Sequence, residues 1–489
     1  MSSARRSLIV LAVPFLSITM TAQQPSPETF AFTHTAAIDV AAGRAMPDMT
    51  VIVTAGRISA VGKSSTLRVP KGAQIVDASG KFLIPGLWDM HVHIADEQEL
   101  PLYVANGVTG VRVMWGLPVH HEWRMAIESG SLTGPRMVIG SRIVDGPLPV
   151  WSESISVRNE QEAREAVRQA RAEGAEFIKV YEVLPREAFF ALVDESKKQG
   201  LSFAGHVPQL VSAGEAADAG MKSMEHLTGI LQASSSRETE LRSVTRAILE
   251  NRRTSSEPRS SPEERRLLMD SFSLEKEKAL LKHLKARGTW QTPTLVVLRN
   301  TDAPDAKVLQ NDPRLKYIPA SLKSYWAEQV APGRRSPEVA AFVKWRYERE
   351  VETVGLMRDA GISLLAGSDV RNPYCMPGFG LQDELALLVQ AGLSPAEALR
   401  TATLNPARFL GREADMGTIA RGKIADLVLL DGNPLADIHS TTRINAVVSN
   451  GRLTGRAALD RMLSQAEAAA IASTGPRPIP GRAPKKSVN

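Results

Sequence analysis

The chain has 489 residues, of which 43% are hydrophobic and 23% are charged, as is typical of a globular protein large enough for more than one domain. The formal net charge is +6, but no basic stripe interleaved with aromatic residues occurs, so the composition argues against a nucleic-acid partner. A single cysteine, Cys375, excludes an internal disulfide, and we interpret it as an incidental loop thiol.

The N-terminal segment has the pattern of an export signal. Arg5 and Arg6 precede an apolar stretch from Leu8 to Met20, and Ala22 offers a cleavage site. We therefore expect a signal peptide over residues 1–22 and a periplasmic or extracellular protein. The apolar stretch is shorter than the ~20 residues that span a bilayer, so we expect no stable membrane insertion after processing. The arginine pair leaves Sec and twin-arginine export both open.

The segments on either side of the chain's middle have β character. An apolar run, a Gly turn and a second run over residues 50–62 predict a hairpin, and strand-like runs return after Gly417. Because these segments flank the middle, we predict that residues 31–82 and 411–458 pair into one composite β-sandwich. The Pro-rich, basic tail over residues 474–489 is predicted to be disordered.

Residues 83–410 alternate short apolar runs with helical segments, which is typical of βα units. Gln161–Glu173 and Pro185–Gln199 carry apolar residues at helical spacing. The predicted fold class is therefore α/β, a (β/α)8 TIM barrel with the small sandwich beside it. The eight strand candidates are Leu83–His93, Val108–Trp115, Arg136–Ile143, Glu176–Tyr181, Ser202–Val207, Lys222–His226, Thr289–Val297 and Ser363–Asp369.

Two connections, residues 231–287 and 300–352, are too long for plain loops and predict helical insertions above the barrel. We interpret the first as surface helices without substrate contact. The second contains Tyr317, Tyr325, Trp326 and Trp345. These aromatic residues leave open both a surface position and a wall of the substrate site.

Histidines and a carboxylate close several of the predicted strands. His91 and His93 point to the same side of a strand, because side chains alternate with a period of two. His206, His226 and Asp369 end three later strands. The C-terminal ends of barrel strands meet at one face, so the pattern predicts a metal site there. Imidazoles with a carboxylate suit zinc, with manganese, iron and cobalt as competitors.

Lys179 lies in the middle of the apolar run Phe177–Tyr181. Spacing alone favours a lysine that extends its ammonium group to water. The alternative is a desolvated amine that takes up carbon dioxide and forms an anionic carbamate between two metal ions.

Five motifs decide between these readings of Lys179: Pro85-Gly-Leu-Trp-Asp-Met-His-Val-His, Phe177-Ile-Lys-Val-Tyr, Ala204-Gly-His-Val-Pro, Met224-Glu-His-Leu and Leu365-Ala-Gly-Ser-Asp. With them the chain resembles the amidohydrolase superfamily, in particular its secreted, imidazolonepropionase-related and prolidase-like branch, over about residues 31–455. The resemblance implies two divalent metal ions, with zinc expected, and carbon dioxide for the carbamate. It implies that His91 and His93 bind the first metal, that Lys179 bridges both, that His206 and His226 bind the second, and that Asp369 contacts the first.

The resemblance implies a metal-dependent hydrolase of amide C–N bonds that uses a metal-bridging hydroxide, with Asp369 as the catalytic proton carrier. The expected substrate is a dipeptide or an N-acyl amino acid. A cyclic amide, a lactone or a toxin amide remains an alternative. An alternative that is not an enzyme is a catalytically inactive binding protein on the same fold. Suitable residues occupy all six expected metal-ligand positions, which argues against it. The sequence leaves open whether the protein forms a homo-oligomer.

Three residues are candidates for substrate binding. Tyr181 directly follows the predicted lysine strand, and Arg142 at the end of the third strand offers a guanidinium to a substrate carboxylate. His120 lies in the loop after the second strand, and at most one of the pair His120 and His121 is expected to face the site. Relatives often carry Arg-Asp on the second strand, where this chain has Val111-Arg-Val-Met, so their substrates do not transfer directly.

Overall fold

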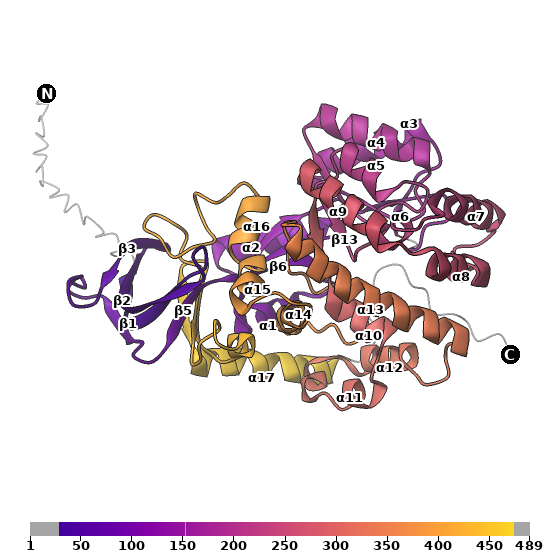
Figure 1. Cartoon of the computed structure of the whole chain (residues 1–489). Coiled ribbons are helices and arrows are strands. Elements are labelled where there is room, and N and C mark those ends of the chain that lie inside the picture. The colour runs from indigo at the N-terminus through magenta and orange to yellow at the C-terminus, as the bar shows by residue number, and fades with distance from the viewer. Residues whose placement is uncertain (1–28, 152, 474–489) are drawn as a thin grey trace, which may run out of the picture.

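The computed structural model describes residues 29–151 and 153–473 (Figure 1). The predicted signal peptide over residues 1–22 and the predicted disordered tail over residues 474–489 lie outside the described residues. Within the described ranges, no helix is both long and apolar enough to cross a membrane.

The two flanking segments of the chain join in one mixed sheet at the end of the molecule that is opposite α7 and α8 in Figure 1. Its order is β17-β16-β15-β5-β1-β2-β3, and β4 pairs in parallel with β1. The contact between the segments is the antiparallel pair β5 and β15. The strands are β1 (Thr29–Asp39), β2 (Arg44–Thr54), β3 (Arg57–Lys63), β4 (Gln74–Asp77), β5 (Phe82–Pro85), β15 (Leu427–Leu430), β16 (Ile444–Ser449) and β17 (Arg452–Gly455).

The predicted hairpin is confirmed as the antiparallel pair β2 and β3. Its two-residue turn consists of Ala55 and Gly56, with φ angles of 50° and 72°. Two successive positive φ angles match the twist of antiparallel strands, and glycine adopts the second one without steric cost. A separate apolar core that includes Phe30, Phe32 and Leu429 fills the interior of this sheet.

The middle of the chain forms parallel strands in two sheets, one with the order β6-β7-β8 and the other with the order β10-β9-β11-β12-β13-β14. The strands are β6 (Leu87–Val92), β7 (Val108–Val113), β8 (Arg136–Ile139), β9 (Ile143–Asp145), β10 (Ile155–Ser156), β11 (Phe177–Val180), β12 (Ser202–Gly205), β13 (Ser223–Glu225) and β14 (Trp290–Thr292).

Backbone hydrogen bonds connect the two parallel sheets at both ends. At one end, the Glu176 N–H donates to the Ile139 carbonyl at 2.9 Å, which joins β8 to β11. At the other end, the segment 363–369 lies between β14 and β6. The Leu365 N–H donates to the Gln291 carbonyl at 2.9 Å, and the Met90 N–H donates to the Ala366 carbonyl at 2.9 Å.

Several predicted strand bounds are wrong. Segment 363–369 has only an isolated bridge between Leu364 and Gln291, because the Ser368 N–H donates to the Asp89 side chain at 2.9 Å and Asp369 has a φ of 50°. The candidate Thr289–Val297 ends as a strand at Thr292, since α10 begins at Leu295. The candidates Leu83–His93 and Arg136–Ile143 are each divided between two strands.

Helices follow most of the parallel strands, and the predicted helices over residues 161–173 and 185–199 are confirmed as α3 and α4. Ala163, Ala166, Val167 and Ala170 of α3 are buried at helical spacing, which places this face against the main core. The helices up to the first insertion are η1 (Glu97–Glu99), α1 (Leu100–Ala105), α2 (Pro118–Ser129), α3 (Glu160–Ala172), α4 (Arg186–Gln199), α5 (Ala213–Asp218) and α6 (Ile230–Ala233).

Both long connections are helical, as predicted. The first contains α7 (Glu238–Asn251), α8 (Pro262–Ser271) and α9 (Leu274–Arg287). The second contains α10 (Leu295–Asp302), α11 (Ala306–Gln310), η2 (Pro313–Tyr317), α12 (Ala320–Gln329) and α13 (Pro337–Asp359). The remaining helices are α14 (Gly380–Gln390), α15 (Pro395–Thr401), α16 (Leu404–Phe409), η3 (Ile438–Thr442) and α17 (Arg456–Ala472).

Candidate metal centre and its cavity

Four imidazoles gather at the C-terminal ends of the parallel strands. His91 lies in β6 and His93 directly follows that strand, whereas His206 follows β12 and His226 follows β13. The ring centroids of His91 and His226 are 4.5 Å apart, those of His206 and His226 are 4.7 Å apart, and those of His91 and His93 are 5.3 Å apart. The structure therefore brings together histidines that are more than 130 residues apart in the sequence.

Asp369 lies among these rings. Its Oδ1 is 3.0 Å from His93 Nε2 and 3.4 Å from His91 Nε2, and its Oδ2 is 3.8 Å from His226 Nε2. His91, His226 and Asp369 each offer a ligand atom, and these atoms lie within 4.8 Å of one another. This is a donor set of two imidazoles and a carboxylate that suits a divalent transition metal.

Three residues of the site have left-handed backbone conformations that residues other than glycine rarely adopt. The φ angles are 57° at His226, 51° at Thr294 and 50° at Asp369. Such a conformation costs of order 1–3 kcal/mol and persists where the surroundings impose it. Here the Asp369 N–H donates to the His91 carbonyl at 2.8 Å, and His226 Nδ1 lies 2.5 Å from Thr294 Oγ1. A backbone hydrogen bond thus fixes the position of Asp369, and the Thr294 hydroxyl fixes the ring of His226.

Lys179 is fully buried at the centre of β11, with its Nζ making no hydrogen bond to any described residue. Burial lowers the pKa of this amine to about 8, against the opposing influence of Glu225 and Asp369. The interpretation as a lysine that reaches water is therefore wrong. His91 Nε2 is likewise buried without a hydrogen bond in the described part of the chain. Buried polar atoms normally have partners, so these two atoms indicate a missing ligand.

Burial also favours the neutral form of His91, His206 and His226, the form that binds metals. It lowers the pKa of His91 and of His206 well below the usual value, and lowers that of His226 to about 3. Burial acts in the opposite sense on Asp369, but His226, His93 and Lys179 outweigh it and hold the pKa of this carboxyl below its usual value. The site therefore presents a carboxylate at Asp369 and neutral imidazoles at His91, His206 and His226 at neutral pH.

A buried network beneath the histidines involves two residues that the sequence analysis did not select. Glu225 Oε2 is 2.9 Å from His91 Nδ1, and Arg112 Nη2 donates to both Glu225 oxygens at 2.9 Å. Arg112 Nε also donates to the Met90 carbonyl at 2.6 Å. A carboxylate on one imidazole nitrogen fixes the direction of the other. Both residues are charged positions within apolar strand runs, which is the sequence signal that points to them.

Asp89 lies two residues before His91 in β6 and binds the segment 363–369. It accepts hydrogen bonds from the Ser368 N–H at 2.9 Å and from the Ser368 hydroxyl at 2.5 Å. Burial raises the pKa of Asp89 to about 7. Asp89 thus anchors the segment that carries Asp369.

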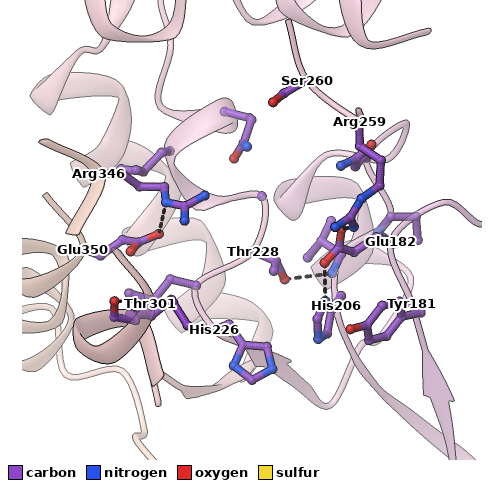
Figure 2. A pocket seen from close by; sticks show the side chains of 18 of the residues that line it. Tyr181, Glu182, His206, His226, Thr228, Arg259, Ser260, Thr301, Arg346 and Glu350 are labelled. Carbon is purple, nitrogen blue, oxygen red and sulfur yellow. Dashed lines mark hydrogen bonds and ion pairs between the residues drawn. The ribbon is translucent and has the colours of Figure 1, made fainter. Parts of the chain in front are cut away.

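A cavity of about 570 Å³ opens above the histidines (Figure 2). His93, His206, His226 and Asp369 line it together with Trp115, Trp151 and Tyr181. Glu182 bridges the histidines to the first insertion, since its Oε1 is 3.1 Å from His206 Nδ1 and its Oε2 forms an ion pair with Arg259. The cavity is large enough for a small-molecule ligand, since such pockets measure ~300–1,000 Å³.

The three predicted substrate residues have different positions. Tyr181 lines the cavity, and its hydroxyl accepts a hydrogen bond from Trp151 Nε1 at 2.9 Å. His120 lies in α2, buried, with Nδ1 3.0 Å from the Leu117 N and Nε2 2.8 Å from the Ile94 carbonyl. Arg142 forms an ion pair with Glu173 at 3.1 Å. Neither His120 nor Arg142 lines the cavity, so their positions disagree with the predicted role.

Both insertions contribute to the cavity wall. Leu241, Arg242 and Leu268 of the first insertion line it, so its interpretation as surface helices without access to the site is wrong. From the second insertion, Phe342, Arg346 and Glu350 line it. The aromatic residues that the sequence analysis singled out in this insertion do not line the cavity. Trp326 is buried and donates to the Arg371 carbonyl at 3.1 Å, and Trp345 packs on Phe272.

The fold and the site thus define an α/β protein with candidate metal ligands at the ends of parallel strands. The chain belongs to the amidohydrolase family, whose pattern it matches over residues 82–454. This confirms the resemblance inferred from the motifs.

Similar proteins and structures support the same assignment. Adenine deaminase 2 of Agrobacterium fabrum is 42% identical over 90 residues, 18% of this chain and 15% of that protein. Imidazolonepropionase of Shouchella clausii is 33% identical over 130 residues, 25% of this chain and 29% of that protein. The matched part of this chain thus spans less than a third of either relative.

Among solved structures, bottromycin amidohydrolase superposes with a TM-score of 0.70 at 24% identity and covers 91% of each chain. An Xaa-Pro dipeptidase with methionine bound in its active site superposes with a TM-score of 0.64 at 19% identity, over 88% of this chain and 100% of that one. These two likenesses show the fold.

Proposed function

We propose that this protein is a metal-dependent hydrolase of amide C–N bonds. The observation that carries the proposal is the pair of buried nitrogen atoms, His91 Nε2 and Lys179 Nζ, that have no hydrogen-bond partner in the described residues and lie in a site with three further imidazoles and a carboxylate. Membership of the amidohydrolase family supports it, as do relatives named for chemistry at C–N bonds.

We assign the metal ligands as in the sequence prediction, and the residues fit two divalent ions, with zinc expected. His91 and His93 would hold the first, His206 and His226 the second, and Asp369 would contact the first. Lys179 would bridge both after reaction with carbon dioxide. A neutral amine is needed for that reaction, and the lowered pKa of Lys179 makes more of this form available near neutral pH.

The bound ions would polarise the scissile carbonyl and lower the pKa of water so that it attacks at neutral pH. The protein's own residues would complete the reaction. Asp369 would accept the proton of the attacking water and deliver it to the leaving nitrogen. Glu225 would hold His91, and Glu182 would hold His206, in the orientation that the metal requires.

We propose a dipeptide or an N-acyl amino acid as the substrate. The cavity volume fits a small molecule, and Tyr181 offers its hydroxyl beside the histidines. The rings of Tyr181 and His206 are 4.0 Å apart. The dipeptidase among the structural neighbours supports this class.

The proposal includes the architecture that positions the site. We propose that β6, β7, β8, β11, β12, β13, β14 and segment 363–369 form the closed (β/α)8 barrel over residues 83–410, supported by the hydrogen bonds between the two parallel sheets. The mixed sheet would be the composite β domain of residues 31–82 and 411–458. We also propose export through the N-terminal signal.

One screen tests the proposed function. Purified protein reconstituted with zinc and bicarbonate is incubated with a library of dipeptides and N-acyl amino acids, and released amine is measured. We expect amine release that a chelator abolishes and that added zinc restores. A reconstituted protein that binds no metal and hydrolyses no amide in the library would contradict the proposal.

A further inference from the structure

Glu350 is a buried acid in the wall of the cavity. It lies in the second half of α13 and is 5% exposed, yet it lines the same cavity as His226 and Asp369. Figure 2 shows Glu350 and Arg346 on one side of this cavity and Glu182 with Arg259 on the other, with the two histidines below them. A ligand bound above the histidines would therefore lie between two walls that each carry a glutamate and an arginine.

The carboxyl group of Glu350 lacks a complete set of partners. Its Oε2 is buried and accepts no hydrogen bond from any residue that the structure describes. Its Oε1 is 3.9 Å from Arg346 Nε, which is longer than a hydrogen bond. Arg346 instead donates through Nε to Asp302 at 2.8 Å, and through Nη2 to the same oxygen. The nearest cation is thus bound mainly to another carboxylate.

The other arginines that line the cavity are also engaged. Arg242 pairs with Glu238, Arg259 pairs with Glu182, and Arg371 pairs with Glu99. Arg265 donates to the Ser260 hydroxyl at 3.1 Å. None of these contacts reaches Glu350, so its Oε2 has no donor among the described residues.

A cationic partner would stabilise the ionised form of this buried acid, with the carboxyl proton released to solvent as the partner binds. Burial raises the pKa of Glu350 to about 8, because the apolar surroundings disfavour its charged form. Phe342, Val297 and Leu298 line the cavity as well. In such a low-dielectric wall, a hydrogen-bonded ammonium group stabilises a carboxylate more strongly than it does in water.

We propose that Glu350 binds a primary ammonium group of the substrate, so that the enzyme selects peptides with a free amine over their N-acylated counterparts. The inference rests on the proposed function and chooses between its two substrate classes. The free dipeptide is then the substrate class, and Glu350 is the residue that recognises its amino end.

The kinetic test compares a dipeptide library with its N-acetylated copy, using metal-reconstituted wild type, Glu350→Gln and Glu348→Gln. Glu348 is the matched control, since it lies on the same helix with 54% of its side chain exposed and Lys344 at 4.0 Å. We expect wild type and Glu348→Gln to favour free amines by roughly tenfold or more in kcat/KM, which corresponds to about 1.4 kcal/mol. In Glu350→Gln this preference disappears through a higher KM for the free dipeptides, with kcat and the acetylated substrates little changed.

Two kinetic outcomes overturn the inference while leaving the proposed function intact. One is equal or better hydrolysis of the acetylated library by wild type. The other is an unchanged amine preference in Glu350→Gln, because glutamine can still donate and accept hydrogen bonds but carries no charge. Hydrolysis of neither library contradicts the proposed function instead.

Calorimetry tests the amine site independently of catalysis. L-leucinamide and N-acetyl-L-leucinamide are titrated into EDTA-treated protein, so that hydrolysis plays no part. We expect L-leucinamide to bind about tenfold more tightly than its acetylated form, with the difference lost in Glu350→Gln and kept in Glu348→Gln. Equal affinities, or no binding of L-leucinamide, overturn the inference.

Discussion

The floor and the wall of the cavity are built in different ways. The floor consists of side chains at the ends of parallel strands, such as His91 and His226, and buried groups like Glu225 hold them. The wall consists of helices from two insertions, where Phe342 and Glu350 of α13 and Leu268 of α8 face the same space. Under the proposed function, the floor would carry the chemistry and the wall would determine the choice of substrate. The two regions should therefore respond differently to mutation.

The largest effect is expected at the floor, from Lys179→Ala. Removal of the proposed bridging group should lower metal content and reduce activity by about 1,000-fold, equivalent to about 4 kcal/mol of transition-state stabilisation. Short carboxylic acids should restore part of the lost activity by supplying an anion in place of the carbamate. Metal analysis and hydrolysis rates measure this, with the exposed Lys198→Ala as control. Full activity in Lys179→Ala would refute the bridging role.

Glu225→Gln should give the next largest effect. The substitution keeps the shape of the side chain but removes the charge that faces His91 and Arg112. Metal affinity or activity should fall about 10- to 100-fold, as for other groups that orient metal-binding histidines. Metal titration and hydrolysis rates measure the two consequences. Unchanged metal affinity would show that Glu225 does not help to position the residues of the floor.

Phe342→Leu tests the wall. Phe342 lines the cavity and packs near Trp345, with ring centroids 6.0 Å apart. We expect KM to change several-fold, with metal content and kcat nearly unchanged, because a loss of about 1 kcal/mol of packing acts on substrate contact alone. The control is Phe190→Leu, which changes a 37% exposed ring away from the cavity. Loss of metal in Phe342→Leu would erase the distinction between wall and floor.

Glu384→Gln tests the connection between floor and wall, and its effect is on stability. Glu384 accepts a hydrogen bond from the Val296 N–H of α10 at 2.8 Å, and burial raises its pKa to about 8. With a folded-state pKa above the ordinary 4.5, the folded state binds more protons than the unfolded state between these values, so this contribution to stability falls as pH rises from about 4.5 to about 8.

Wild type should therefore lose stability relative to Glu384→Gln across that range, by at least about 1 kcal/mol in total, since one pKa unit corresponds to about 1.4 kcal/mol. Urea unfolding of both proteins at pH 5 and pH 8 measures the difference. A constant difference between the two proteins at both pH values would show that Glu384 ionises normally.

Sequence patterns predicted which side chains gather in the floor, because these residues obey local rules. His91 and His93 lie two residues apart on one strand, and His206, His226 and Asp369 each follow an apolar run. Lys179 needed the family motifs, because its burial depends on neighbours from other strands. The strand predicted to end at Asp369 is absent in the structure. There, the Ser368 N–H donates a hydrogen bond to the Asp89 side chain.

The wall was not predictable in the same way. The aromatic content of the second insertion drew attention to Trp326 and Trp345, yet both pack into helix contacts, and Phe342 lines the cavity instead. Which face of an insertion helix meets the cavity depends on packing between helices far apart in sequence. Arg142 and His120 do not line the cavity for a related reason, since Arg142 pairs with Glu173 of another element and His120 Nε2 is 2.8 Å from the Ile94 carbonyl.

The most direct test of the central claim is the metal content of the reconstituted protein. After treatment with zinc and bicarbonate and removal of free metal, elemental analysis should find two divalent ions per wild-type chain and none, or nearly none, in Lys179→Ala. A wild-type protein that retains no metal, or a Lys179→Ala variant that retains both ions, would contradict a two-metal centre bridged by Lys179.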